Sequence, residues 1–411
     1  TQYADELSRY MSEAGCVDRI DVAGSIRRAR ETVGDVDILV ASDDPAAVVD
    51  RFVSYPAAEA ILARGGTRAS IRLRSGLNVD LRVLEKKCYG AALHYFTGSK
   101  AHSIAIRKLG LKKGLKINEY GVHRGARWIA GHDEAEVFKA VGLPWIPPEL
   151  REDRGEIEAA HERNLPSLVT LDDVRGDLQS HTTSSDGRDT LEAMADAAEA
   201  LGYEYLAVTD HTPSVRIAGG LDAQGFRRQW KRIDRLNARL KKLTLLKGVE
   251  VDIALNGSLD LKDSTLAGFD VVLASIHSHF NLSREEQTSR MLRAIAHPGV
   301  HMIAHPTARI IGRRQSLSLD LEAIFRAAAD ENVILEVNAQ PERLDLDDMA
   351  IRRAIEMGVI LSIDTDAHSV AELRFMRWGV DQARRGWAER RNILNTRSLT
   401  QLLKLLKKRS Q

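Results

Sequence analysis

The sequence contains few cysteines, no long apolar run and almost no net charge, and each absence excludes a class of protein. Cys16 and Cys88 are the only cysteines among 411 residues, which excludes a disulfide-stabilised scaffold and indicates a reducing compartment. No run of about 18 uncharged apolar residues occurs, so we expect no membrane span and no membrane partner. The 59 basic side chains are balanced by 58 acidic ones, which argues against a uniformly basic nucleic-acid binder.

The first residues read TQYADELSRYM, without an initiating Met. They also lack the basic-then-apolar pattern of a secretory signal. We therefore expect the chain to begin inside a longer protein. At roughly 100–200 residues per domain, its length predicts two to three domains.

Basic residues are concentrated in two zones. Residues 64–127 hold fifteen Lys or Arg and three acids, and residues 374–411 hold eleven and two. Such zones on a neutral chain favour a surface that binds a polyanion. In the second zone, LLKLLKKRS is also typical of an ordinary amphipathic last helix, so both interpretations stay open there.

Strand and helix patterns divide the chain into two parts. Residues 1–140 mix helix and strand, with a strand at 33–41 and a hairpin at 71–84 around Ser75-Gly76. A Pro-rich and charged segment at 142–155 then predicts a linker. The rest alternates strands with helices, and the expected strands are 174–180, 204–209, 245–253, 270–276, 301–304, 333–338 and 359–363. About seven β/α units predict a parallel sheet closed into a barrel.

Three aspartates in the first part form a candidate metal site. Asp35 and Asp37 project from one face of a strand, and Asp80 adds a third carboxylate if its strand pairs with theirs. Three oxygen ligands suit Mg²⁺, which takes the rest of its shell from water and phosphates. The neighbouring Gly24-Ser25 turn, Arg27, Arg28 and Gly34 can cradle a triphosphate.

The motifs AGSIRRARETVGDVDILV, VDLRV, HYFTGSKAHSIAIR and INEYGVHR resemble the palm and thumb of family X DNA polymerases. The resemblance implies a palm at 1–88 and a thumb at 89–150, with Asp35, Asp37 and Asp80 holding catalytic Mg²⁺. It also assigns nucleotide-binding roles, which fall on Gly24, Ser25, Arg28, Gly34, Tyr95, Phe96, Thr97, Gly98 and Arg107. Two positions depart from the family: Ser103 stands where Asn is usual, and Asn78 where vertebrate relatives carry Arg. The helix-hairpin-helix modules of the family precede the palm, where this chain begins.

Histidines and carboxylates recur after the predicted strands of the second part, in QSHTTSSDG, TDH, GVEVD, SIHSH, IAHP and DTDAH. The ends of parallel strands share one face of a barrel, so these side chains are expected to converge. Imidazole with carboxylate suits Zn²⁺, Mn²⁺ or Fe²⁺.

This pattern resembles the PHP (polymerase and histidinol phosphatase) domain, a seven-stranded (β/α)7 barrel with metal-dependent phosphoesterase activity. The resemblance implies a linker at 151–173, a PHP domain with a C-terminal helix at 174–411, and up to three ions. The ligands that it implies are Gln179, His181, Asp186, His211, Glu250, His277, His305, Asp366 and His368. Gln179 replaces the first His of the family's H-x-H, and an amide oxygen is a weaker ligand than an imidazole. Asp210, Asp252 and Asp364 are expected to orient the ligands.

Together the two resemblances imply a DNA repair enzyme that fills gaps with dNTPs and has a Mn²⁺-dependent 3′–5′ exonuclease or 3′-end phosphoesterase. We expect a cytoplasmic, nucleoid-associated monomer acting on gapped DNA or DNA 3′ ends. Two alternatives stay open. One is a phosphatase of small molecules such as histidinol phosphate, and the other is a DNA-end binding module whose nuclease is impaired by Gln179.

Overall fold

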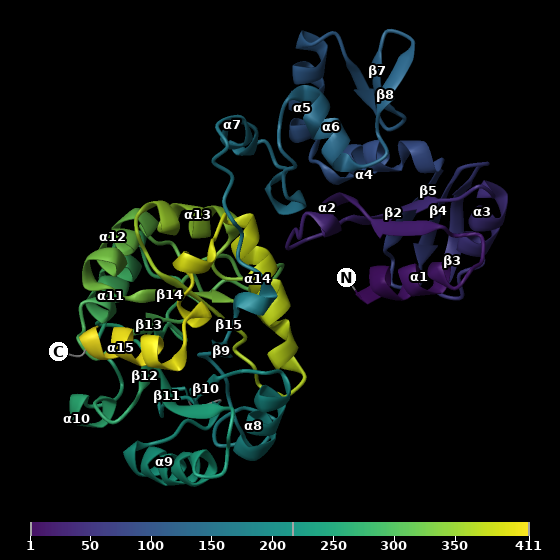
Figure 1. Ribbon diagram of the computed structural model, residues 1–411. Coiled ribbons are helices and arrows are strands. Elements are labelled where there is room, and N and C mark those ends of the chain that lie inside the picture. Colours follow the sequence, from purple (N-terminus) through teal and green to yellow (C-terminus); the bar gives the residue numbers. More distant parts are fainter. Residues whose placement is uncertain (1, 216–217, 410–411) are drawn as a thin grey trace. The chain divides into compact units, whose positions relative to one another are not determined.

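A computed structural model describes residues 2–215 and 218–409. The chain divides into two compact units, Thr1–Leu165 and Pro166–Gln411. This division falls inside the segment 151–173 that was expected to be a linker. The expected ends of the palm at residue 1 and of the PHP domain at residue 411 lie outside the described residues. Each unit is described by itself (Figure 1).

The first unit is built around a five-stranded sheet with the order β1-β2-β5-β4-β3. Its strands are β1 (Arg19–Val22), β2 (Asp35–Ala41), β3 (Ala58–Arg64), β4 (Arg68–Leu73) and β5 (Asn78–Leu84). Helices α1 (Gln2–Ser12) and α3 (Pro45–Val53) cover one face, where leucine, valine and phenylalanine side chains form a buried core. Strands β4 and β5 make the hairpin predicted around Ser75-Gly76, and β2 runs parallel to β5.

A helical layer and a small sheet complete this unit. The helices are α2 (Gly24–Arg27), α4 (Tyr89–Thr97), α5 (Lys100–Lys112), α6 (Glu134–Val141) and α7 (Glu156–His161). The small sheet has the order β6-β7-β8, with strands Lys116–Asn118, Gly121–Arg124 and Arg127–Ala130. The Pro-rich segment before α7 does not lie open to solvent throughout, because Ile146, Leu150 and Arg151 are buried.

Seven parallel strands form the second unit, in the order β15-β14-β13-β12-β11-β10-β9. They are β9 (Gly176–Asp177), β10 (Tyr205–Val208), β11 (Thr244–Asp252), β12 (Val271–Ser275), β13 (Met302–Ile303), β14 (Ile334–Asn338) and β15 (Leu361–Asp364). Each overlaps a strand predicted from the sequence. A parallel bridge from Ser180 to Ala367, just beyond β9 and β15, brings the two edges of the sheet together. The seven-stranded barrel is therefore nearly closed.

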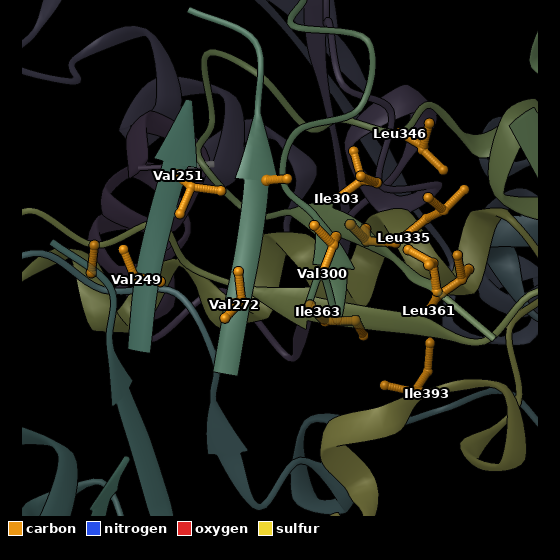
Figure 2. Packing of buried hydrophobic residues seen from close by; sticks show 14 of the residues in the cluster. Val249, Val251, Val272, Val300, Ile303, Leu335, Leu346, Leu361, Ile363 and Ile393 are labelled. Carbon is orange, nitrogen blue, oxygen red and sulfur yellow. The ribbon is translucent and has the colours of Figure 1, made fainter. Parts of the chain in front are cut away.

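Helices surround these strands (Figure 1). They are α8 (Leu191–Ala200), α9 (Ala223–Asn237), α10 (Asp263–Leu266), α11 (Arg284–Ile295), α12 (Leu321–Glu331), α13 (Asp348–Glu356), α14 (Met376–Arg385) and α15 (Leu399–Arg409). Alternate strand residues such as Val249, Val251 and Val272 pack outward in the layer between strands and helices (Figure 2). Because both faces of these strands are buried, their sequences are the short apolar runs that predicted the strands.

The remaining strand residues point into the barrel, and helix α15 closes one end of it. Leu402 and Leu406 of α15 join a buried cluster with Tyr205, Val271 and Met302, which are the first residues of their strands. The helix therefore seals the end where the strands begin. Among the residues that the structure describes, no helix is both long and apolar enough to cross a bilayer.

Candidate active sites

The three aspartates of the first unit lie on one face of its sheet. The parallel register of β2 and β5 places Asp37 opposite Asp80, and Asp35 opposite Asn78. Val36 and Ile38 point to the other face, into the core beneath α1 and α3. The alternation that buries these residues therefore turns the aspartates outward. Ser70, opposite Asp80 on β4, donates a hydrogen bond to its carboxylate.

Repulsion between these carboxylates contributes to a raised pKa at Asp37. Burial, and then the charges of Asp35 and Asp80, raise the pKa of Asp37 to about 6. Clustered carboxylates of this kind are stabilised by a divalent cation, so the donor set fits Mg²⁺. Their oxygens are not gathered as tightly as the histidine cluster described below, since no described group of three oxygens here lies within 4.8 Å.

The Gly24-Ser25 turn lies directly against the central aspartate. Gly24 begins α2 with a φ of +63°, and a Cβ atom placed on it would lie 2.2 Å from Oδ2 of Asp37. Only glycine fits this conformation and this close approach. Gly34 is exposed and has open space around its Cα. The turn, with Ser25 in its first helical residues, thus runs beside the aspartates.

Two arginines connect this turn to the predicted thumb. Arg27 donates to Thr97 Oγ1 at 2.7 Å and makes two hydrogen bonds to Glu134, at 2.7 and 2.8 Å. Arg28 donates to the Thr97 carbonyl at 2.8 Å and to Glu152 at 3.0 Å. The start of α2 is therefore fixed relative to the end of α4.

The remaining expected nucleotide-binding residues lie around the end of α4. Tyr95 and Phe96 are half-buried with ring centroids 5.1 Å apart, and the Arg82 guanidinium lies 4.6 Å from the Phe96 ring. Gly98 follows α4, and Arg107 on α5 lies 5.9 Å from the Tyr95 ring. Aromatic rings and guanidinium groups suit contacts with a nucleotide.

In the second unit the expected metal ligands gather where the strands end. His181, His211, His277 and His305 follow β9, β10, β12 and β13, while Glu250 lies on β11 and Asp366 and His368 follow β15. Three overlapping groups have ligand atoms within 4.8 Å of one another: His181, Asp186, His211 and His368; His211, Glu250 and His277; and His181, Glu250 and Asp366. Side chains separated by up to 187 residues thus share one centre.

The charges of this centre are balanced by protons on imidazoles. Burial lowers the pKa of His277, but hydrogen bonds to Asp252 and Glu250 raise it to about 9. Burial also opposes the charge on His368, and Asp186 and Asp366 raise its pKa to about 10. Bound cations would replace these protons, because metal binding requires neutral imidazole and ionised carboxylate.

Several buried atoms of this centre make no hydrogen bond within the described chain, among them Gln179 Oε1 and His305 Nδ1. Gln179 is fully buried, with Nε2 3.4 Å from Asp366 Oδ1. His305 Nε2 lies 2.9 Å from Glu250. Unpartnered ligand atoms at such depth are costly unless something binds them, so the residues fit divalent cations.

Two aspartates beside the ligands, Asp252 and Asp210, have different roles: one contacts a ligand and the other contacts a loop. Asp252 contacts His277 Nδ1 at 3.2 Å, as expected of an orienting carboxylate. Asp210 instead accepts hydrogen bonds from Thr182 and Ser185, and so fixes the loop between the ligands His181 and Asp186.

Sequence reasoning did not identify a second layer of carboxylates below the centre. Glu336 is fully buried and accepts hydrogen bonds from the His305 backbone N–H at 2.6 Å and from Asn338 at 3.1 Å. Asp177 accepts a hydrogen bond from Thr365. An acidic residue inside an otherwise apolar strand, such as Glu336 in VILEVN, is the sequence signal that could have identified them.

Comparison with known proteins gives a family match in each of the two units. The family described as DNA polymerase beta thumb matches residues 92–152, and the PHP domain family matches residues 177–340. Over 409 residues the chain is 40% identical to a Bacillus subtilis protein named DNA polymerase/3′-5′ exonuclease PolX, covering 98% of this chain and 71% of that protein.

Two further proteins each match part of the chain. A probable phosphatase of Acetivibrio thermocellus is 34% identical over 166 residues, covering 39% of this chain and 64% of that protein. A structure of Leishmania infantum polymerase beta in a ternary P/T complex is 24% identical with a TM-score of 0.33, covering 37% of this chain and 74% of that one.

The barrel fold, the two family matches and the Bacillus subtilis relative define the class: a nucleotidyltransferase of the polymerase beta type joined to a PHP phosphoesterase barrel. Such proteins are enzymes that depend on divalent metals. The chain belongs to the family X DNA polymerases that carry a PHP domain.

Proposed function

We propose that this chain combines gap-filling nucleotidyl transfer with a 3′–5′ exonuclease that processes DNA 3′ ends, at two separate sites. The observation that carries the proposal is the convergence of three overlapping ligand groups where the barrel strands end. Overall identity to the Bacillus subtilis protein named DNA polymerase/3′-5′ exonuclease PolX supports it.

In the first unit we assign Asp35, Asp37 and Asp80 to Mg²⁺. The Gly24-Ser25 turn, Arg28 and Gly34 are assigned to the triphosphate, Tyr95, Phe96, Thr97 and Gly98 to the nucleotide, and Arg107 to the template. In the reaction, the primer 3′-hydroxyl loses its proton to water, its oxygen bonds to the α-phosphorus, and the bond from that phosphorus to pyrophosphate breaks. The contacts of Arg28 to Thr97 and Glu152 hold its guanidinium beside the turn, which reduces the cost of positioning it.

In the second unit we assign Mn²⁺, with Zn²⁺ or Fe²⁺ as the alternatives, to up to three positions. The proposed ligands are Gln179, His181, Asp186, His211, Glu250, His277, His305, Asp366 and His368. When bound, such cations supply a water nucleophile at neutral pH and neutralise phosphate charge. Asp252 holds the His277 ring in place through its hydrogen bond at 3.2 Å. Water adds to the phosphorus, and the 3′-oxygen of the preceding nucleotide leaves with a proton.

The partners that we propose are gapped DNA, DNA 3′ ends and dNTPs. We propose that the protein is a monomer and that it acts in the cytoplasm, associated with the nucleoid. We also propose a palm at 1–88, a thumb at 89–150, a linker at 151–173 and a PHP domain at 174–411. The division at Leu165 and Pro166 supports this order, as do the matched ranges 92–152 and 177–340.

A phosphatase acting on monoesters is a second candidate for the PHP unit. It is favoured by the match to the probable phosphatase of Acetivibrio thermocellus, which is confined to part of the chain. The fifteen basic residues between 64 and 127 favour DNA instead, because a small substrate needs no extended positive surface. A DNA-end binding module without nuclease activity is the non-enzymatic alternative.

Two isosteric substitutions test the proposal, each serving as the control for the other. Asp80→Asn should abolish gap filling and leave exonuclease activity intact, and Asp366→Asn should do the reverse. His305→Ala should also remove the exonuclease. Both activities are measured on 3′-recessed, gapped and 3′-phosphorylated DNA, and phosphatase activity is measured on histidinol phosphate. Each assay is run once with Mg²⁺ and once with Mn²⁺.

The outcomes separate the alternatives. Loss of both activities in both folded variants would contradict the two-site proposal. Hydrolysis of histidinol phosphate without attack on DNA would establish the phosphatase. DNA binding without any Mn²⁺-dependent product would establish the binding module.

A further inference from the structure

A basic pocket opens beside the last helix of the second unit. The basal pocket, as we call it, has a volume of about 750 Å³ and is lined by Arg390, Arg391, Arg397 and Lys404, with Thr396, Gln401 and Leu405. The arginines come from the segment that leads into α15, and Lys404 comes from the exposed face of α15. No acidic side chain is among these lining residues.

The positive charge of the basal pocket is only partly compensated. Arg397 is held by the backbone carbonyls of Ile393 and Arg391, at 3.2 and 3.3 Å, rather than by an acid. Arg390 has Asp173 at 3.7 Å, and Arg391 pairs with Glu389. A guanidinium fixed by carbonyls is already oriented and keeps its charge available for an anion.

A second pocket of about 330 Å³ adjoins the first, and the two share Arg397 and Leu405 as lining residues. Its lining includes the apolar Val333, Ile334 and Ile360, together with the polar residues Asp330, Glu331 and Asn332. A pocket of this size with apolar walls and a few polar groups is suited to a planar ring such as a nucleobase. The two pockets therefore offer anion binding and ring binding side by side.

These pockets lie at the end of the barrel remote from the histidines. Ile334 is the first residue of β14, and the α15 side chains beside them pack on the first residues of β10, β12 and β13. The metal ligands follow the opposite ends of the same strands. The basal pocket is therefore separate from the metal centre.

We propose that the basal pocket and its neighbour bind single-stranded DNA, with phosphates on the arginines and Lys404 and an unpaired base against Val333, Ile334 and Ile360. Four cations suit several phosphates in a row rather than one anion. The apolar pocket requires a base that is free of a partner strand, which excludes duplex. That the nucleic acid is DNA rests on the proposed function.

Such a site supplies an anchor outside the metal centre. A strand held there is kept at high local concentration near the enzyme while its end is processed or after it is released. The binding needs no divalent metal, since arginine and lysine alone contact the phosphates. This independence makes the inference testable without catalysis.

The experiment uses the full chain in EDTA with a labelled twelve-nucleotide oligo-dT. The variant Arg390→Gln/Arg391→Gln/Lys404→Gln removes three exposed charges from the basal pocket. Its matched control, Arg235→Gln/Lys241→Gln/Lys242→Gln, removes three exposed charges elsewhere on the same unit. Loss of about three phosphate contacts should lower the salt dependence of binding by about 2 in log–log slope, so a fourfold rise in salt should weaken binding by the natural chain about 16-fold more than binding by the variant.

Hydrogen exchange locates the binding. Oligo-dT should protect amides of residues 390–406 in the natural chain and in the control, and an abasic oligomer should protect them less. Three results would overturn the inference: no protection of residues 390–406, an equal loss of affinity in the variant and in its control, or equal affinity for oligo-dT and the abasic oligomer. Failure of metal-dependent DNA cleavage with protection retained would instead refute the proposed exonuclease alone.

Discussion

The buried ion cluster around Glu134 allows a sharp prediction about the first unit. Arg151 is fully buried and donates to Glu134 Oε1 at 2.5 Å, while Arg27 donates to both oxygens of the same carboxylate. Glu134→Gln keeps the shape of the side chain but leaves two guanidinium groups without their counterion. Breaking a buried pair in this way costs about 3–5 kcal/mol of unfolding free energy.

Hydrogen exchange of α6 measures this cost for the first unit separately from the second. Amides of α6 should exchange roughly two to four orders of magnitude faster in Glu134→Gln, which is the free-energy loss at 1.36 kcal/mol per tenfold. Lys139→Gln, on the exposed side of the same helix, is the matched control and should change exchange much less. Equal effects of the two substitutions would refute the reasoning.

The same cluster fixes the direction of a pH effect. Burial alone would raise the pKa of Glu134, but Arg27 and Arg151 hold that pKa well below its usual value of 4.5. As pH falls through the usual pKa, the unfolded state binds a proton at Glu134 before the folded state does. The contribution of Glu134 to the free energy of unfolding is therefore complete above about pH 5 and is lost as pH falls. Glu134→Gln should flatten the acid side of the stability profile of the first unit.

Three further predictions concern the two sites and the barrel. Gly24→Ala places a Cβ 2.2 Å from Asp37 Oδ2 at a φ of +63°, so gap filling should fall by about 100-fold or more while exonuclease activity is unchanged; equal loss of both activities would contradict this. Removing metal with EDTA should lower the melting temperature of the second unit, by the equivalent of about 2.7 kcal/mol if the metal had been at 100 times its dissociation constant. Asp366→Asn should shrink that difference in calorimetry, and an unchanged difference would mean that the ligand assignment is wrong. Leu402→Ala should cost about 2–5 kcal/mol in urea unfolding of the second unit, whereas Leu405→Ala, at an exposed neighbour on the same helix, should cost much less; similar costs would mean that α15 does not seal the barrel.

Strands β2, β4 and β5 and the barrel strands could be predicted because their residues alternate between two faces or form short apolar runs, whereas β1 and β3 were not predicted. The alternation in 71–84 predicted the β4–β5 hairpin, and the apolar runs between 174 and 363 predicted all seven barrel strands. The seven-unit count followed from these runs, so the barrel class could be inferred before any geometry was known.

What could not be predicted depends on long-range packing. Arg151 lies in a Pro-rich, charged segment that is typical of a solvated linker, yet Glu134 draws it into the interior. Glu336 and Asp177 resemble ordinary strand residues, and only the closed barrel shows that they lie below the ligands. The tail was read either as a basic surface or as an amphipathic helix; its leucines close the barrel while Lys404 faces outward.

The seal formed by α15 has a consequence for biosynthesis. Leu402 and Leu406 occupy the same buried cluster as Leu178, which leaves the ribosome more than two hundred residues earlier. The inner apolar surfaces of the early strands therefore stay uncovered until α15 emerges. Nascent chains of this protein are expected to need chaperone protection throughout that interval, and a ribosome stalled before residue 402 should expose a protease-sensitive barrel.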